Sequence, residues 1–238
     1  MKLAGRVAVV TGASRGLGRA VARALAAEGA AVALAARSGA ELAAVAAEIA
    51  RAGGRARAVP TDVTSESAVE ALVREAVGAF SRIDILVTAA GVAVFGPVAD
   101  AKIADWDAML AVNLRGVMLT CRAVAPVMVR QGSGTVINVA SIAAARGIPG
   151  AAAYGACKAG VVAWSRALAE ELRGAGVRVG VVLPGAIDTP LWDAVTNPPD
   201  RGKMLRPEQV AEAVTLMAAL PAGATLEELT LLPAGGIL

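Results

Sequence analysis

The residues best suited to chemistry in this sequence are its only tyrosine, Tyr154, and one of its four lysines, Lys158. They lie four positions apart, and residues four apart on a helix share a face. A cation beside a phenol favours the phenolate, so it lowers the tyrosine pKa from its usual value of about 10. The spacing therefore predicts Tyr154 as a general acid or base that works near neutral pH.

The composition excludes several other kinds of catalytic site. Without histidine, the chain cannot build a Ser-His-Asp or Cys-His nucleophile, and a zinc site of the usual kind is not expected. The two cysteines, Cys121 and Cys157, have no metal-ligand spacing, and we interpret them as reduced thiols. We therefore expect no metal in the site.

Length and composition predict one soluble α/β domain over residues 1–238. Hydrophobic residues make up 56% of the chain, but no unbroken apolar run approaches the roughly 18 to 20 residues of a membrane span. The run 7–10 is too short for the apolar core of a signal peptide, so we expect a cytoplasmic protein with no membrane partner. The net charge of +3 comes with scattered arginines and few aromatic residues, which argues against a nucleic-acid partner.

Short apolar, β-branched runs alternate along the chain with longer segments rich in Ala, Leu, Glu and Arg. This alternation predicts repeated βα units around a buried parallel sheet. The expected strands lie near 6–11, 30–36, 55–60, 83–89, 134–140, 177–183 and 228–232.

Several helices are placed by their start signals and length. Ser38 opens a Ser-x-x-Glu capping box, and Pro207 followed by an acid is typical of a first helical turn. Two long helices are expected over about 103–130 and 151–173, and the second carries the tyrosine and lysine described above. The segment 190–203 has no clear period and is predicted to be a loop.

A glycine-rich turn follows the first expected strand and opens the first helix. Glycines permit a tight turn and a close approach of the backbone to a ligand, while the helix N-terminus offers free N–H groups and a partial positive charge to a phosphate. In this place in a βα series, the turn predicts a dinucleotide site. The expected contacts are Gly12, Ser14, Arg15, Gly16, Leu17 and Gly18.

The residues after the second expected strand indicate which dinucleotide is bound. An acid near that position usually binds the ribose 2′-hydroxyl of NAD, but this chain has Arg37 followed by Ser38. Arginine pairs with a 2′-phosphate, and Arg15 in the glycine turn could reach the same group. We therefore expect contacts from Arg37 and Ser38 and a preference for NADP(H) over NAD(H). The alternative is that Arg37 is a solvated surface residue and Ser38 is only a helix cap.

Together these features resemble the short-chain dehydrogenase/reductase family. Asn113, Ser141, Tyr154 and Lys158 match its catalytic tetrad in order and spacing, and the glycine turn matches its Thr-Gly-x-x-x-Gly-x-Gly motif. The resemblance spans nearly the whole chain and implies a doubly wound Rossmann-type fold, with a seven-stranded parallel sheet flanked by helices on both faces. It also implies cofactor contacts from Asp62, Val63, Ala90, Gly91, Tyr154, Lys158, Pro184, Gly185, Ile187 and Thr189.

One motif departs from the family pattern. Relatives often read Asn-Asn-Ala-Gly after the fourth strand, where this chain has Thr88-Ala89-Ala90-Gly91. The Ala-Gly pair that lets the backbone approach the adenosine ribose is kept, and Thr88 supplies a hydroxyl in place of an amide. Cofactor binding is still expected.

The resemblance implies hydride transfer between nicotinamide and a carbonyl or secondary alcohol substrate. Tyr154 would give its proton to the substrate oxygen, and Ser141 would hydrogen-bond that oxygen where negative charge develops. Lys158 would lower the tyrosine pKa and bind the nicotinamide ribose. Asn113, in a helix, would position a water that links the lysine to solvent.

By analogy, the substrate wall contains Val94, Phe95, Ala143, Ile148 and Trp192. These side chains are apolar, which indicates a small apolar or weakly polar carbonyl compound or alcohol. The expected 190–203 loop is short, so an open pocket is favoured over an enclosed one.

Two alternative functions stay open at this stage. A 3-oxoacyl-carrier-protein-type ketoreductase would have basic residues grouped beside the pocket mouth, and Arg115, Arg122 and Arg130 are the candidates. A non-catalytic sensor or scaffold that binds NADP on the same fold would have no need of the tetrad.

The apolar residues of the two long helices cover more surface than one sheet-facing stripe needs. Large exposed apolar areas usually mark interfaces, so we expect a homo-oligomer, most simply a tetramer of two-fold symmetry. The resemblance implies that these two helices pair with their copies and that the final strand, with its tail to Leu238, forms a second interface.

Overall fold

The computed structural model describes residues 1–195 and 198–237 and confirms the predicted fold class. Over these residues, seven parallel strands form one sheet in the order β3-β2-β1-β4-β5-β6-β7. Each strand lies within its expected range or extends one residue beyond it. The strands are β1 (Val7–Thr11), β2 (Ala31–Ala36), β3 (Arg55–Pro60), β4 (Ile85–Thr88), β5 (Gly134–Val139), β6 (Val177–Pro184) and β7 (Glu228–Leu231).

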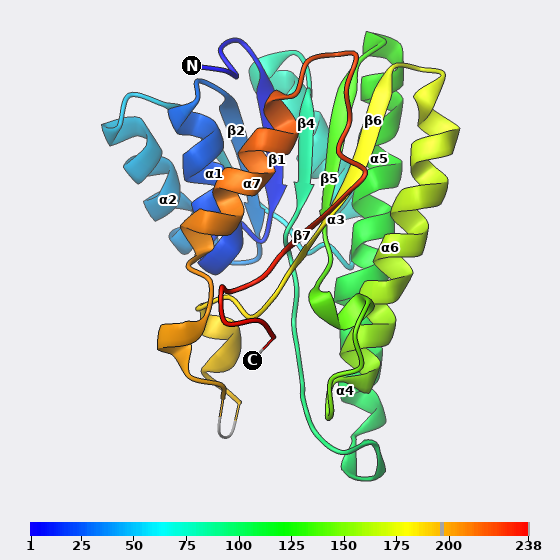
Figure 1. Ribbon diagram of the computed structural model, residues 1–238. Coiled ribbons are helices and arrows are strands. Elements are labelled where there is room, and N and C mark those ends of the chain that lie inside the picture. Colours follow the sequence, from blue (N-terminus) through cyan, green and yellow to red (C-terminus); the bar gives the residue numbers. More distant parts are fainter. Residues whose placement is uncertain (196–197, 238) are drawn as a thin grey trace.

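Helices cover both faces of this sheet (Figure 1). Side chains alternate along each strand, so Ala8 and Val10 join the core on one face while Val9 joins the core on the other. Both faces are therefore apolar, which explains the continuous hydrophobic runs in the sequence. One face carries α1 (Gly16–Ala27), α2 (Gly39–Arg51) and α7 (Pro207–Ala219), and the other carries α3 (Glu66–Phe80), α5 (Gly116–Gln131) and α6 (Ala152–Arg173).

The strand order reverses beside β1. This strand pairs with both β2 and β4, so the chain leaves β1 toward one face and leaves β4 toward the other. In open parallel sheets, ligands bind beyond the carboxyl ends of the strands at such a reversal. Gly12 follows β1 at this place, and Gly91 lies in the segment after β4.

The expected helical stretch over 103–130 is confirmed, although a π-helical turn interrupts its α-helical geometry. The structure has α4 (Ile103–Leu110), a π-helical turn (Ala111–Arg115) and then α5. Within the π turn, the buried Asn113 accepts a hydrogen bond from the Val92 N–H at 2.9 Å and donates one to the Val92 carbonyl at 2.7 Å. π turns of this kind are frequent at functional sites.

By length and hydropathy alone, the composite helix Ile103–Gln131 could cross a membrane. However, Val117, Val124 and Met128 are buried in the core against the sheet. Core helices of globular domains pass the same length and hydropathy test, and this helix occupies such a position.

The expected helix starts are confirmed, and the expected loop contains short helical turns. Ser38 caps α2 by accepting the Glu41 N–H, and α7 begins at Pro207. Two 3₁₀ turns, Pro190–Trp192 and Arg201–Lys203, lie within the segment predicted as a loop. Thr196 and Asn197 of that segment, and Leu238 of the predicted interface, lie outside the described residues.

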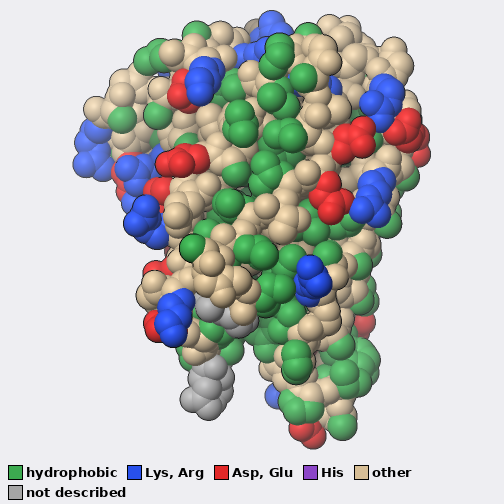
Figure 2. Space-filling view, in the orientation of Figure 1, with side chains coloured by type: hydrophobic (Ala, Val, Ile, Leu, Met, Phe, Trp, Pro, Cys, Tyr) green, Lys and Arg blue, Asp and Glu red, His purple; other side chains and the backbone are tan. Residues whose placement is uncertain are grey.

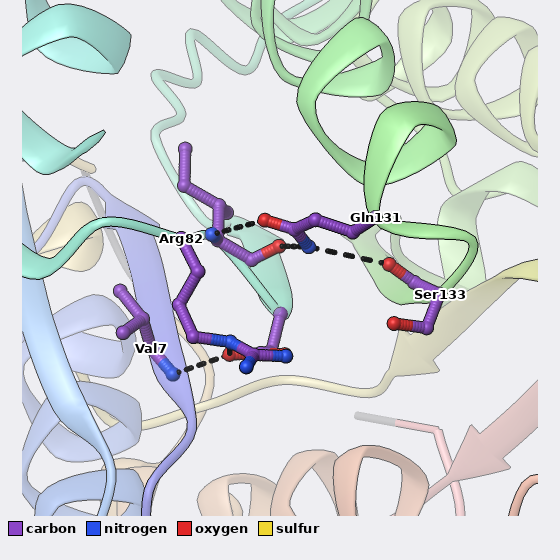
Figure 3. Close-up of polar contacts among 6 residues, drawn as sticks. Val7, Arg82, Gln131 and Ser133 are labelled. Carbon is purple, nitrogen blue, oxygen red and sulfur yellow. Dashed lines mark hydrogen bonds and ion pairs between the residues drawn. The ribbon is translucent and has the colours of Figure 1, made fainter.

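A polar cluster lies at the amino ends of β1 and β4, the ends opposite those that lead into the glycine turn and Gly91 (Figure 3). The Asp84 carboxylate, 4% exposed, accepts the Val7 N–H at 2.9 Å and two Arg82 N–H bonds at 2.8 and 2.6 Å. Beside it, the Gln131 side chain exchanges two hydrogen bonds with the Ile83 backbone. These contacts fix the start of β1, the entry to β4 and the end of α5 to one another.

Candidate active site

A cleft with a volume of about 1470 Å³ lies at the carboxyl edge of the sheet. Figure 2 shows the molecule hollowed at this lower edge, with hydrophobic side chains gathered above the hollow. Every site residue predicted from the sequence lines this cleft except Asn113, which is buried behind it. The lining residues among them are Gly12, Ser14, Arg15, Gly16, Leu17, Gly18, Arg37, Ser38, Asp62, Val63, Ala90, Gly91, Val94, Phe95, Ser141, Ala143, Ile148, Tyr154, Lys158, Pro184, Gly185, Ile187, Thr189 and Trp192.

The glycine turn has a shape that other residues could not adopt. Gly12 has a φ of +69°, and a Cβ there would lie 2.8 Å from the Ala89 backbone. A Cβ on Gly18 would lie 2.2 Å from the Gly12 carbonyl oxygen. No side chain caps the first turn of α1 and no acid lies in it, so its N–H groups are free to bind a phosphate. The turn therefore fits the pyrophosphate of a dinucleotide.

Two arginines lie on the cleft wall next to this turn. Arg15 and Arg37 are exposed, and no described carboxylate lies within ion-pair distance of either one. The pKa of Asp62 is held below its ordinary value, first by hydrogen bonds from the Thr64 N–H and hydroxyl and then by the Arg37 charge. Both guanidinium groups are therefore available to an anionic ligand.

Tyr154 and Lys158 lie one helical turn apart at the start of α6, as the spacing predicts. The Lys158 Nζ atom lies 5.7 Å from the centre of the tyrosine ring and donates a hydrogen bond to the Val139 carbonyl at 2.9 Å. Ser141 follows β5 and caps a short 3₁₀ turn by accepting the Ala143 N–H at 3.2 Å. The hydroxyl, phenol and ammonium groups thus meet at one end of the cleft.

The prediction of a lowered tyrosine pKa is wrong for the protein by itself. Burial raises the pKa of Tyr154 to about 12, although a hydrogen bond with Ser141 opposes the rise. Burial also lowers the pKa of Lys158 to about 8. The physical reason is that the lysine is desolvated too and directs its Nζ–H bond to Val139 instead of to the phenol oxygen. At neutral pH the tyrosine is a neutral phenol, which is the form that can donate a proton.

Gly91 leaves the space in which the lysine and the asparagine approach each other. A Cβ on Gly91 would lie 3.2 Å from the Asn113 Oδ1 atom and 3.9 Å from the Lys158 Nζ atom. The Asn113 side chain accepts one hydrogen bond from the Val92 backbone and donates one to it. The lack of a side chain at Gly91 therefore lets the buried asparagine and lysine lie close together.

The threonine that departs from the family pattern has a structural partner. The Thr88 hydroxyl donates to the Asn138 side chain at 2.8 Å, and the Asn138 amide donates to Ser165 at 2.9 Å. This buried chain of hydrogen bonds ties β4 to β5 and α6. Separately, Ala90 donates its N–H to the Thr11 hydroxyl at 3.3 Å, which keeps the segment after β4 close to the end of β1.

The predicted substrate residues come from three connections that follow β4, β5 and β6. Phe95 lies edge-on to Tyr154, with ring centres 5.6 Å apart, and stacks on Trp192 at 5.4 Å and 13°. A second cavity of about 260 Å³ shares Phe95 with the cleft. Sequence reasoning missed several lining residues, and only adjacency to predicted residues could have suggested most of them. They include Ala89, Val92, Asp105, Ala108, Val112, Ile142, Leu191 and Ile237.

The three arginines proposed for a carrier site do not gather at the cleft. Arg115 donates to the Thr64 carbonyl, and Arg122 pairs with Glu66 at the start of α3. Arg130 lies near the far end of α5. None of the three is among the described residues that line the cleft.

Comparisons with known proteins extend over the whole chain. The family described as short chain dehydrogenase matches residues 6–200. The chain is 39% identical over 241 residues to a 3-oxoacyl-[acyl-carrier-protein] reductase from Synechocystis sp., covering 99% of this chain and 98% of that protein. Its fold is similar to that of a metagenomic short-chain oxidoreductase in complex with NADP (TM-score 0.86, 39% identity, 98% and 99% of the two chains). It is also similar to an alcohol dehydrogenase from the archaeon Thermococcus sibiricus complexed with 5-hydroxy-NADP (TM-score 0.90, 34% identity, 96% and 97%).

Proposed function

Because this chain belongs to the short-chain dehydrogenase family, we propose that it is an NADP(H)-dependent oxidoreductase acting on a carbonyl or secondary alcohol substrate. The proposal is supported by the arrangement of three side chains in the cleft. Tyr154, Ser141 and Lys158 meet on one wall of a cleft whose other end is the glycine turn. A bound dinucleotide supplies the hydride in such a site, and the chain supplies the proton and the positioning.

The proton step belongs to Tyr154 with Ser141 beside it. The tyrosine is protonated at neutral pH, so it donates its proton to a carbonyl oxygen as negative charge develops there. Ser141 hydrogen-bonds the same oxygen, and the nearby Lys158 ammonium favours the phenolate left behind. In the direction of alcohol oxidation, the Tyr154 phenolate accepts the proton of the alcohol, and Ser141 again hydrogen-bonds the substrate oxygen.

The residues of the cleft also support a preference for NADP(H) over NAD(H). Arg15 and Arg37 lie where the adenosine ribose would bind, and neither is paired with a described carboxylate. A 2′-phosphate would offer both a charge-assisted partner. Two structurally similar proteins carry NADP or 5-hydroxy-NADP, which agrees with this choice.

A second candidate is reduction of an acyl chain held on a carrier protein. Its support is the similarity to the 3-oxoacyl-[acyl-carrier-protein] reductase. Against it, neither Arg115 nor Arg122 lines the cleft, and their guanidinium groups are bound to the Thr64 carbonyl and the Glu66 carboxylate. The free carbonyl substrate is therefore the main proposal.

We also propose that the chain works as one catalytic and cofactor-binding unit over 1–238, in the cytoplasm, as a tetramer. The apolar surface of the composite helix Ile103–Gln131 supports assembly, because Ile103 is 62% exposed, Leu110 46% and Val129 42%. Such residues on one composite helix are suited to pairing with a second copy.

The test is NADPH consumption over a panel of ketones, aldehydes and an acyl-carrier substrate, with Tyr154→Phe as the matched variant. The wild type should reduce at least one free carbonyl compound. Tyr154→Phe should lose at least about a hundredfold in kcat, the scale of positioned proton transfer, while it binds NADPH with unchanged affinity. A variant as fast as the wild type would exclude this mechanism, and binding without any turnover would favour the sensor alternative.

A further inference from the structure

Two aromatic rings from different connections of the sheet form a row beside the proposed proton donor. Phe95 follows β4 and Trp192 follows β6, and their rings stack with centres 5.4 Å apart. Phe95 also lies edge-on to Tyr154. Three of the six aromatic residues in the chain are therefore joined in one row that begins at the ring of Tyr154.

Trp192 is held in this row by the residues on both sides of it in the sequence. Its indole N–H donates to the Ile187 carbonyl at 2.9 Å. Arg201 binds both flanks of the tryptophan turn, because its guanidinium contacts the Asp188 carboxylate, the Thr189 carbonyl at 3.1 Å and the Asp193 carboxylate at 2.9 Å.

The number and direction of these contacts matter more than their individual strength. A single exposed ion pair contributes little to stability. A planar guanidinium with three partners fixes their relative directions, which an ammonium or a single pair does not. Asp188 and Thr189 precede Trp192 and Asp193 follows it, so Arg201 fixes the turn that presents the indole to Phe95.

We propose that Arg201 is a positioning residue that holds Trp192 against Phe95, and that this aromatic roof selects flat, uncharged aryl carbonyl compounds. The proposal rests on the function proposed above and names its substrate class. A flat aryl ring can stack on the row beside the phenol, whereas a saturated ring has no face to offer. The Arg201 guanidinium is already bound to two carboxylates, so it is not available to bind an anionic substrate. Asp105, which lines the cleft and the second cavity as Phe95 does, would repel such a substrate.

The test compares acetophenone with cyclohexyl methyl ketone, which has the same carbon skeleton but a saturated ring. The enzymes are the wild type, Trp192→Leu, Arg201→Gln and Arg201→Lys. The control is Arg173→Gln, because Arg173 also binds two carboxylates, Glu170 and Glu227, but neither of these partners lines the cleft, whereas Arg201 binds the cleft residue Thr189. The measured quantity is the ratio of kcat/KM for the two ketones relative to the same ratio in the wild type, which cancels their intrinsic reactivity.

We expect this ratio to fall about tenfold in Trp192→Leu, the scale of a lost aromatic stack. Arg201→Gln should lower it by about fivefold, through a higher KM for acetophenone with kcat within about twofold, since the variant removes positioning and not the acid. Arg201→Lys should lower the ratio about as much as Arg201→Gln, because an ammonium keeps the charge but not the planar group that joins the three partners. Arg173→Gln should leave the ratio unchanged.

Acrylamide quenching of tryptophan fluorescence gives a readout that needs no turnover. Each protein is measured with and without the additional change Trp192→Phe, so that the difference reports Trp192 alone. Trp192 should become more accessible to acrylamide in Arg201→Gln and stay as protected as in the wild type in Arg173→Gln.

The outcomes separate this proposal from the proposed function. If the wild type reduces both ketones and neither Trp192→Leu nor Arg201→Gln changes the ratio, the aromatic roof is refuted while the reductase function stands. If no carbonyl compound is reduced, the proposed function fails. Unchanged quenching of Trp192 in Arg201→Gln overturns the positioning role in either case.

Discussion

Replacing Lys158 by methionine should make the protein more stable while it loses the ammonium group of the proposed site. Lys158 is 4% exposed, donates one hydrogen bond, to Val139, and has a pKa lowered by burial from 10.5 to about 8. Methionine has a similar length and no charge to desolvate. The lysine is thus a place where stability and chemistry demand different residues.

The size and the pH dependence of the effect follow from the two pKa values. Below about pH 8 the lysine is charged in both the folded and the unfolded chain, so the folded state bears the whole free-energy cost of burying the charged ammonium group. At about 1.4 kcal/mol for each pH unit between the two values, that penalty is about 3 kcal/mol. The lost hydrogen bond to Val139 offsets about 1 kcal/mol of it. Between about pH 8 and 10.5 the folded protein releases the proton first, so the wild type gains stability as the pH rises.

The assay is urea unfolding of both proteins without cofactor at about pH 7 and about pH 9. Lys158→Met should be more stable by about 2 kcal/mol at the lower pH, and its advantage should shrink by about 1 kcal/mol at the higher pH. Burial raises the pKa of Tyr154 and Cys121, which lowers stability at high pH, but both proteins contain these groups and the difference removes them. A variant no more stable than the wild type at pH 7, or an advantage that does not change with pH, would refute the reasoning.

Three further predictions concern the cofactor, the amino edge of the sheet and assembly. Arg37→Asp should reverse the order of kcat/KM for NADPH and NADH, because it exchanges a phosphate partner for a hydroxyl partner and adds repulsion; a wild type that prefers NADH would contradict this. Arg82→Gln should lower the free energy of unfolding by about 2 kcal/mol with kcat unchanged, because it leaves the buried Asp84 carboxylate without its cation. Adding Asp84→Asn to this variant should recover part of the loss. Equal urea midpoints for the wild type, the single variant and the double variant would contradict this prediction. Light scattering behind a sizing column should give a tetramer, and one stable species at the monomer mass of 23.6 kDa would exclude assembly.

The features that the sequence predicted well depend on neighbouring residues. Strands such as β1 and β5 follow from short β-branched runs, and the start of α2 follows from the Ser38 cap. The Tyr154–Lys158 pair follows from helical spacing, which predicts that both side chains lie on one face of α6.

The features that it did not predict depend on residues that are distant in the chain. The π turn accompanies a reciprocal pair of hydrogen bonds between the Asn113 side chain and the Val92 backbone, and no local pattern marks it. The raised pKa of Tyr154 reflects burial, which a spacing argument does not measure. Ile237 reaches the cleft only because the chain end folds back beside it.

The polar cluster at Asp84 has a consequence for how this scaffold can change over generations. It secures β1, β4 and α5 at one edge of the sheet, whereas the segments that carry Phe95 and Trp192 leave from the other edge. Substitutions and length changes in those segments leave the cluster intact. New pockets can therefore arise by exchanging connections at one edge, while inherited contacts at the opposite edge keep the strands in register.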